Sequence, residues 1–146
     1  ELYSGAGLFT LPLAALVGSG GEVLSLEGNE QAVRDARRTL HDHPAARLAS
    51  GRVSARSVRE LAGSLTGGRP DVVVLDPPRQ GAGREVIEAV GALGTERIVL
   101  VACDPAALAR DLGTLLRSGY TLGSMSALDM FPHTHHFETI AVLERS

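Results

Sequence analysis

The sequence predicts an α/β fold built on a mostly parallel sheet. Three observations carry this prediction: strand-like and helix-like segments alternate along the chain, two runs rich in β-branched residues have the length of buried strands, and a glycine-rich turn lies near the start. The 146 residues are enough for one domain with a single core. Residues 1–146 are therefore expected to form one domain.

The expected elements follow one another at regular spacing. Helices are expected over residues 8–17, 29–40, 58–65, 85–93 and 105–117, with Asn29 and Pro105 as start signals. Strands are expected over residues 22–27, 52–55, 71–75, 97–102, 121–128 and 137–143. The runs DVVVL (71–75) and RIVLVA (97–102) are typical of strands buried on both faces. The last two strands have no helix between them, which predicts an antiparallel pair at one edge.

This order matches the seven-stranded, Rossmann-like arrangement of class I S-adenosylmethionine-dependent methyltransferases, provided that the first strand lies mostly upstream of Glu1. The chain has no initiator Met and begins almost directly on the glycine-rich turn. We therefore expect a C-terminal fragment of a longer protein, with its first strand partly missing.

The composition excludes several classes of protein. No apolar run approaches the roughly 18–20 residues that span a bilayer, and the first residues lack the basic stretch of a signal peptide. The single cysteine, Cys103, rules out an internal disulfide and fits a reducing compartment, so we expect a cytoplasmic protein. The net charge is −3, whereas a domain that grips nucleic acid by itself is usually basic. If RNA is the substrate, its backbone is expected to be held mostly by regions outside this chain.

The turn Tyr3-Ser4-Gly5-Ala6-Gly7 and the later Glu27 favour a cofactor that carries adenosine. Such sheets bind ligands beyond the carboxyl ends of their strands, and glycine lets the backbone approach a ligand closely. Glu27 ends the next strand, where a carboxylate commonly accepts from ribose hydroxyls. A bare strand-to-helix turn and a solvated strand end are the structural alternatives. These features do not separate a nicotinamide dinucleotide from S-adenosylmethionine, although a dehydrogenase normally has a third glycine where Thr10 stands.

The end of the third expected strand is less informative. Methyltransferases often place a carboxylate or amide there to meet the adenine amino group. This chain has Arg56-Ser57-Val58, so backbone groups or Ser57 are expected to serve.

Reactive side chains follow both buried strands. Asp76 begins the run Asp76-Pro77-Pro78-Arg79, in which two prolines stiffen the chain as it leaves the sheet; an exposed proline turn is the structural alternative. Cys103 follows the next strand and precedes a helix N-terminus, whose partial positive charge favours a thiolate. A lone cysteine near a sheet is otherwise most often an inert buried residue. We interpret Asp76 as a carboxylate facing the cofactor and Cys103 as a nucleophile.

The run 129–139 contains three histidines and Glu138. A zinc site is the alternative there, but His135 and His136 are adjacent and would point to opposite sides of a strand. No second cysteine is available as a ligand. We expect no metal site, and interpret the run as a loop that brings Glu138 to the site as an acid or base.

These motifs together resemble the catalytic domain of the RNA 5-methyluridine (uracil-5-) methyltransferase family, whose members modify tRNA or ribosomal RNA. The resemblance runs from Leu2 to the C-terminus. It includes the Tyr-Ser-Gly-Ala-Gly turn, the Asp-Pro-Pro-Arg run at Asp76, the Cys-Asp-Pro-Ala run at Cys103 and the Asp-Met-Phe-Pro-His-Thr-x-His-x-Glu run from Asp129 to Glu138. The last two runs in this order are highly specific.

The resemblance implies a role for each motif. The methyl donor is S-adenosylmethionine, and the matching cofactor positions are Tyr3, Gly5, Gly7, Glu27 and Asp76. Cys103 is similar to the nucleophile that adds to C6 of uracil, and Glu138 to the base that removes the C5 proton. The partner is RNA, with its target base looped out or flipped.

The chain departs from the family in ways that keep alternatives open. Ala102 stands where serine is common, and family members are much longer, with an upstream region that contacts cofactor and RNA. A non-catalytic cofactor-binding or RNA-scaffold fragment is one alternative, and an RNA cytosine-5-methyltransferase is another. An amino-methyltransferase is disfavoured because Arg79 replaces the aromatic residue that such enzymes use.

Overall fold

The computed structural model describes residues 1–130, 133 and 137–146. The described residues form a mixed sheet in the order β2-β1-Leu2-β3-β4-β6-β5, because Leu2 bridges in parallel to Leu26 of β1 and to Leu75 of β3. The strands are β1 Val23–Glu27, β2 Ala46–Ser50, β3 Val72–Leu75, β4 Arg97–Ala102, β5 Tyr120–Leu128 and β6 Glu138–Arg145. Only β6 runs antiparallel to its neighbours β4 and β5. The predicted parallel sheet with an antiparallel pair at one edge is confirmed.

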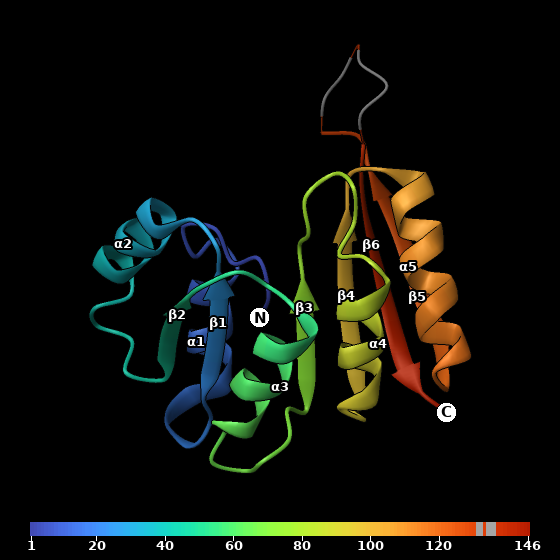
Figure 1. Cartoon of the computed structure of the whole chain (residues 1–146). Helices are drawn as coiled ribbons and strands as arrows, with labels where there is room; N and C mark the ends of the chain where they lie inside the picture. The colour runs from blue at the N-terminus through green and yellow to red at the C-terminus, as the bar shows by residue number, and fades with distance from the viewer. Residues whose placement is uncertain (131–132, 134–136) are drawn as a thin grey trace.

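Helices cover both faces of this sheet (Figure 1). They are α1 Thr10–Val17, α2 Glu30–Thr39, α3 Ala55–Gly63, α4 Arg84–Ala92 and α5 Pro105–Arg117, with a short 3-10 turn, η1, over Gly18–Gly20. In the view of Figure 1, α3, α4 and α5 lie side by side in front of the sheet, and α1 lies behind β1. No helix among the described residues is long and apolar enough to cross a membrane.

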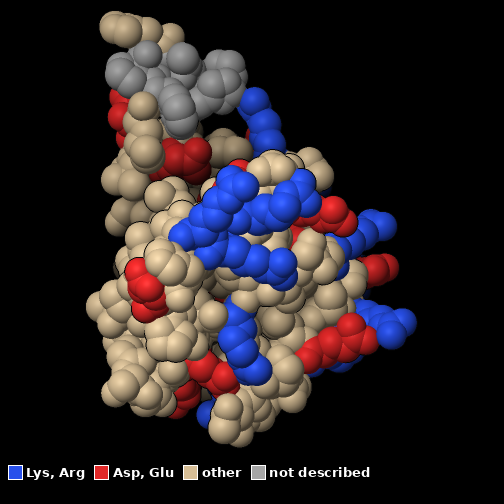
Figure 2. Space-filling model, turned by 90° about the vertical axis from the view of Figure 1, so that its left-hand side faces the viewer, with Lys and Arg blue, Asp and Glu red and all other residues tan. Residues whose placement is uncertain are grey.

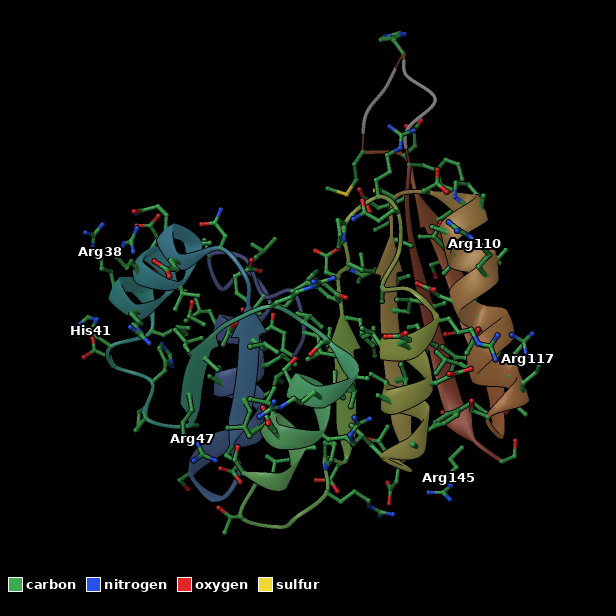
Figure 3. The ribbon with its side chains drawn as sticks, viewed as in Figure 1. Arg38, His41, Arg47, Arg110, Arg117 and Arg145 are labelled. Carbon is green, nitrogen blue, oxygen red and sulfur yellow. The ribbon has the colours of Figure 1, made fainter. Side chains whose placement is uncertain are left out.

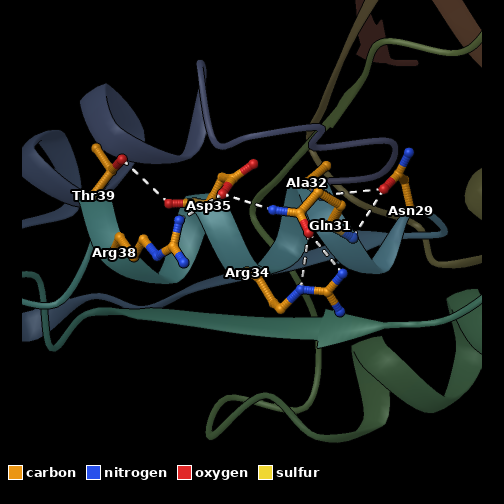
Figure 4. A network of polar contacts seen from close by, with 7 residues as sticks. All are labelled: Asn29, Gln31, Ala32, Arg34, Asp35, Arg38 and Thr39. Atoms are coloured by element: carbon orange, nitrogen blue, oxygen red, sulfur yellow. Dashed lines mark hydrogen bonds and ion pairs between the residues drawn. The ribbon is translucent and has the colours of Figure 1, made fainter.

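Local hydrogen bonds explain where the helices begin. The Asn29 side chain accepts from the N–H groups of Gln31 and Ala32 and so caps α2, as predicted. Further along α2, polar side chains one turn apart pair on the exposed surface, including Gln31 with Arg34 (Figure 4). Asp104 caps α5 by accepting from Ala107 N at 2.8 Å.

The strand expected over 52–55 is wrong. If the Leu2 segment is counted as the first strand, the third is β2, Ala46–Ser50, which pairs in parallel with β1. Ser54 and Ser57 form a reciprocal capping box, each hydroxyl accepting from the other's backbone N–H, so this stretch starts α3 instead.

The core lies between the sheet and helices α3 to α5. Leu75, Ile98 and Leu100 from the central strands are fully buried against Ile87 and Leu115. The prediction that β3 is buried on both faces holds for one face only: Val73 and Leu75 are buried, whereas Val72 is 45% exposed. The face of β3 turned away from the core helices is therefore open in the described part of the chain.

Candidate active site

The carboxyl end of β4 and the start of β6 lie at the same end of the sheet, called the Cys103 edge below, because these strands are antiparallel. Their last paired residues at this edge are Ala102 and Thr139. Cys103 and Glu138 come next in the two strands, and both are half-buried. Glu138 also pairs with Leu128 at the end of β5. The structure therefore brings the predicted nucleophile and the predicted base to neighbouring positions.

Asp76 reaches the same edge from β3. Its backbone N–H donates to the carbonyl of Leu2 at 3.3 Å, which ties it to the centre of the sheet. Asp76 is exposed as a residue, but partial desolvation of its carboxyl raises the pKa, and the negative charges of Glu138 and Glu1 raise it further. β3 pairs in parallel with β4, with Leu75 opposite Leu100, so Asp76 leaves the sheet at the same end as Cys103. Three of the predicted site residues thus meet at the ends of β3, β4 and β6.

The glycine turn follows Leu2, which lies in the sheet between β1 and β3. Gly5 and Gly7 have φ values of 53° and 91°, which favour glycine. A side chain at Gly7 would come within 3.3 Å of the Ala36 Cβ on α2, so this glycine permits close packing. At Gly5 an added Cβ would meet nothing within 4 Å. The turn is therefore packed on one side and open on the other.

Glu27 holds this turn in place. Its carboxylate accepts from Gly5 N at 2.8 Å and from Asn29 N at 2.7 Å. Each carboxylate oxygen thus has one partner and a further lone pair for a ligand. Glu27 is half-exposed at the strand end, so a hydroxyl-bearing ligand can reach it.

Tyr3 is half-buried and has a φ of 63°, which is uncommon for a residue other than glycine. Burial raises the pKa of its phenol, and the negative charge of Asp111 raises it further. Asp111 lies in α5.

Sequence reasoning missed Asp111, which is 5% exposed. Its carboxylate accepts from Ala82 N at 2.8 Å, in the loop that follows Asp76. The sequence did contain a signal, because Asp111 stands among Ala107, Leu108, Thr114 and Leu115 on the buried face of α5. An acidic residue at a core-facing position of an amphipathic helix needs a partner.

Ser57 lies in the first turn of α3, so its expected place at a strand end is wrong. Its hydroxyl donates to the carbonyl of Arg52 at 2.9 Å and accepts from Ser54 N, inside the first turn of α3. The position after the third strand belongs instead to Gly51, whose N–H donates to the carbonyl of Glu27 at 2.8 Å.

The expected histidine loop is described only in part. His133 is exposed with a φ of 68°, and the zinc alternative at His135 and His136 lies outside the described residues. Among the residues that the structure describes, no group of three or more His, Cys, Asp or Glu side chains is placed to hold a metal ion.

Charge is unevenly spread over the surface. Figure 2 shows a face on which arginines gather over α2, β2 and the start of α3. Its exposed members are Arg34, Arg37, Arg38, Arg47, Arg52, Arg56 and Arg59. Several pair with carboxylates, among them Arg47 with Glu22 at 2.7 Å. Arg38 and Arg47 lie on the side of the sheet away from α5 (Figure 3), so this face is separate from the Cys103 edge.

Comparison with known proteins gives one family. A model of the tRNA (uracil-5-)-methyltransferase family matches residues 1–146. An RNA methyltransferase of Streptomyces avermitilis is 46% identical over 144 residues, which are 99% of this chain and 32% of that protein. The 23S rRNA (uracil(1939)-C(5))-methyltransferase RlmD of Acinetobacter baumannii is 37% identical over 146 residues, 99% of this chain and 31% of that protein. The chain thus spans about a third of the length of these relatives.

Solved structures agree on the fold. The tRNA (uracil-54, C5)-methyltransferase of Pyrococcus abyssi, in complex with S-adenosyl-L-homocysteine, matches with a TM-score of 0.78 and 32% identity over 98% of this chain and 32% of that chain. Fibrillarin of Aeropyrum pernix, with bound S-adenosyl-L-methionine, matches with a TM-score of 0.74 and 15% identity over 96% and 64% of the two chains. The predicted Rossmann-like fold of S-adenosylmethionine-dependent methyltransferases is confirmed.

Proposed function

Because this chain belongs to the tRNA (uracil-5-)-methyltransferase family, we propose that it is the catalytic, S-adenosylmethionine-binding part of an enzyme that methylates C5 of a uridine in tRNA or ribosomal RNA. The observation that carries the proposal is the position of Cys103 and Glu138: Cys103 follows Ala102, Glu138 precedes Thr139, and Ala102 and Thr139 are paired. A nucleophile and a base at neighbouring positions suit a reaction on two adjacent carbons. The relatives support the substrate class, since one is named for a uracil of 23S rRNA and another for a uracil of tRNA.

Tyr3, Gly5, Gly7, Glu27 and Asp76 are the residues proposed to hold S-adenosylmethionine. Glu27 fits the group because each of its carboxylate oxygens keeps a lone pair for a ribose hydroxyl. Gly5 fits because an added side chain would meet only open space, so the backbone is accessible to a ligand. When bound, S-adenosylmethionine supplies a methyl group on a positively charged sulfur.

The chain's own residues carry the rest of the proposed reaction. The Cys103 thiolate forms a bond to C6 of uracil, and the electron pair of the C5–C6 double bond moves onto C5 and O4. This enolate makes C5 nucleophilic enough to take the methyl group. The Glu138 carboxylate then accepts the C5 proton, the double bond re-forms, and the thiolate leaves C6. Both side chains end the cycle ready for a second turnover once Glu138 releases its proton. The reactive thiol suits a reducing compartment, so the proposed location is the cytoplasm.

Trapping the covalent intermediate tests this proposal. In RNA that contains 5-fluorouridine, fluorine at C5 cannot leave as a proton, so the protein as its gene encodes it should form a stable adduct in the presence of S-adenosylmethionine. Denaturing gel electrophoresis and mass spectrometry of the adduct should place RNA on Cys103, and Cys103→Ala should form none. An adduct that persists in Cys103→Ala would falsify the assignment of the nucleophile.

Glu138→Gln tests the base separately. This variant should accumulate an adduct with ordinary uridine RNA, because the C5 proton stays in place and elimination stalls. Glu144→Gln is the matched control: it changes a carboxylate of the same strand at the opposite end, where Glu144 pairs with Arg97, and it should turn over normally. Full turnover by Glu138→Gln contradicts the role of Glu138 as the base. If the unsubstituted protein forms an adduct with 5-fluorocytidine RNA and none with 5-fluorouridine RNA, the target base is cytosine.

A further inference from the structure

The loop between β3 and α4, residues 76–83, is held by α5, the helix that begins just after Cys103. Asp111 accepts from Ala82 N at 2.8 Å. Arg110 donates from Nη2 to the carbonyl of Gln80 at 3.4 Å, and Figure 3 shows it near the upper end of α5. Arg79 lies 3.9 Å from the carboxylate of Asp104, the residue that follows Cys103. Three side chains of one short stretch thus contact the loop.

Asp111 is the buried contact among these three. Burial raises the pKa of its carboxyl, while the backbone N–H groups of Ala82 and Gly83 and the charge of Arg110 act in the opposite direction. An acid in the core is costly unless such groups satisfy it. Gly83, the N-cap residue of α4, offers no side chain to cap that helix, so Asp111 supplies a negative group at its positive end.

Gly81 shows how closely the loop packs against α5. Its φ is +85°, and an added Cβ would lie 2.8 Å from Oδ2 of Asp111 and 3.3 Å from the Cβ of Ala107. The loop therefore lies directly on one face of α5. Gly83 has nearly the same φ, +84°, yet an added Cβ there would meet nothing within 4 Å. The close approach to Asp111 is local to Gly81.

We propose that Asp111 is a positioning residue for methyl transfer: it fixes loop 76–83 against α5, the helix that follows Cys103, and so holds Arg79 beside Asp104, the residue next to the nucleophile. This inference rests on the proposed function. Asp76, at the start of the loop, is held by Leu2 of the sheet, so Asp111 acts mainly on the far part of the loop. The charge of Asp111 also acts on Tyr3, a proposed cofactor residue, but among the described residues Asp111 is hydrogen-bonded to the loop and not to the Tyr3 phenol. We therefore expect loss of Asp111 to disturb the step with RNA more than the binding of S-adenosylmethionine.

Variants on both sides of the contact test this proposal in the protein as its gene encodes it. Asp111→Ala removes the acceptor, and Asp111→Asn restores one acceptor oxygen for Ala82 N. We expect single-turnover methylation of uridine RNA to fall at least tenfold in Asp111→Ala and to recover in part in Asp111→Asn, with the Kd for S-adenosylmethionine changed less than threefold. Thr114→Ala is the control, because Thr114 is similarly buried one turn along α5 and its hydroxyl bonds only within that helix, donating to Arg110 O and accepting from Arg117 Nη2.

Gly81→Ala tests the same contact if the Asp111 variants do not fold. It should slow single-turnover methylation more than Gly83→Ala, which introduces the same unfavourable φ without the clash. Hydrogen exchange adds a readout independent of activity: the amides of residues 80–84 should exchange faster in Asp111→Ala and in Gly81→Ala than in their controls. A single-turnover rate within twofold of the control, or unchanged exchange of these amides, overturns the positioning role. If the wild type methylates no uridine, the proposed function fails, and the exchange data alone decide whether Asp111 holds the loop.

Discussion

Glu27 combines a structural contact with a proposed ligand contact, and substitution separates the two. In Glu27→Ala, the N–H groups of Gly5 and Asn29 lose acceptors at 2.8 and 2.7 Å. A hydrogen bond to a charged group contributes about 1.5–3 kcal/mol when buried, and this side chain is half-exposed, so water replaces part of the loss. We expect a total of about 1–2 kcal/mol, or a fall in Tm of ~3–8 °C for a domain of this size.

Glu27→Gln should keep one oxygen for a backbone N–H but lose the charge that binds ribose hydroxyls. We expect this variant to lose about 0.5–1 kcal/mol of stability, and its affinity for S-adenosylmethionine to fall about 10- to 100-fold, since about 1.4 kcal/mol corresponds to tenfold. Isothermal titration calorimetry measures the affinity, and thermal unfolding measures the stability.

Glu22→Gln is the matched control for Glu27→Gln. Glu22 lies just before β1, at the opposite end of that strand from Glu27, and also accepts from a backbone N–H, that of Thr66. Its loss also removes the ion pair with Arg47 at the surface, and such pairs contribute little. Glu22→Gln should therefore lower stability by a similar small amount and leave cofactor affinity unchanged. An affinity for S-adenosylmethionine that falls no further in Glu27→Gln than in Glu22→Gln refutes the ribose contact.

Three further changes test the fold and the charges at the site. Leu75→Ala, at a fully buried position of β3, should cost about 3–5 kcal/mol in urea unfolding; a loss below about 1 kcal/mol would contradict the described core. Asp104→Ala removes the cap of α5 and should cost about 1 kcal/mol, measured in the same assay. Asp76→Asn should unfold at a higher temperature than the wild type near neutral pH but bind S-adenosylmethionine more weakly. Because the folded-state pKa of Asp76 is raised, its ionised form destabilises the fold as pH rises above the ordinary value of 3.8. The stability gain of Asp76→Asn should therefore vanish at low pH, and a gain that is constant with pH would contradict the raised pKa.

The sequence predicted elements whose residues carry their own signal. The helix start signals at Asn29 and Pro105 and the β-branched run of β4 are local features, and their helices and strand begin within one residue of expectation. The segment Ala46–Ser50 has no β-branched residue, and it is a strand because it pairs with β1. Ser54 and Ser57 are expected in or after a strand but form the start of α3, because their reciprocal capping is visible only in three dimensions.

The candidate site also has residues that the sequence indicates and one that only the structure shows. Cys103, Asp76 and Glu27 were identifiable because each stands directly at the end of a recognisable strand, where parallel sheets bind ligands. The contact of Asp111 with Ala82 joins residues 29 apart in the sequence, and it depends on how α5 packs beside the loop. Periodicity places Asp111 on the buried face of its helix but says nothing of what it meets there.

The charges at the Cys103 edge are themselves an argument for the proposed function. Asp76 and Glu138 repel each other, and Glu1 adds to this repulsion. A domain that only had to fold would be more stable with one of these carboxylates replaced by an uncharged residue. A positively charged sulfur held near these carboxylates would offset the repulsion, and its charge would disappear once the methyl group leaves. The product would then bind less tightly than the methyl donor, which favours its release. Asp76→Asn should therefore bring the affinities for S-adenosylmethionine and S-adenosylhomocysteine closer together. An unchanged ratio of the two affinities would count against an electrostatic role for this carboxylate.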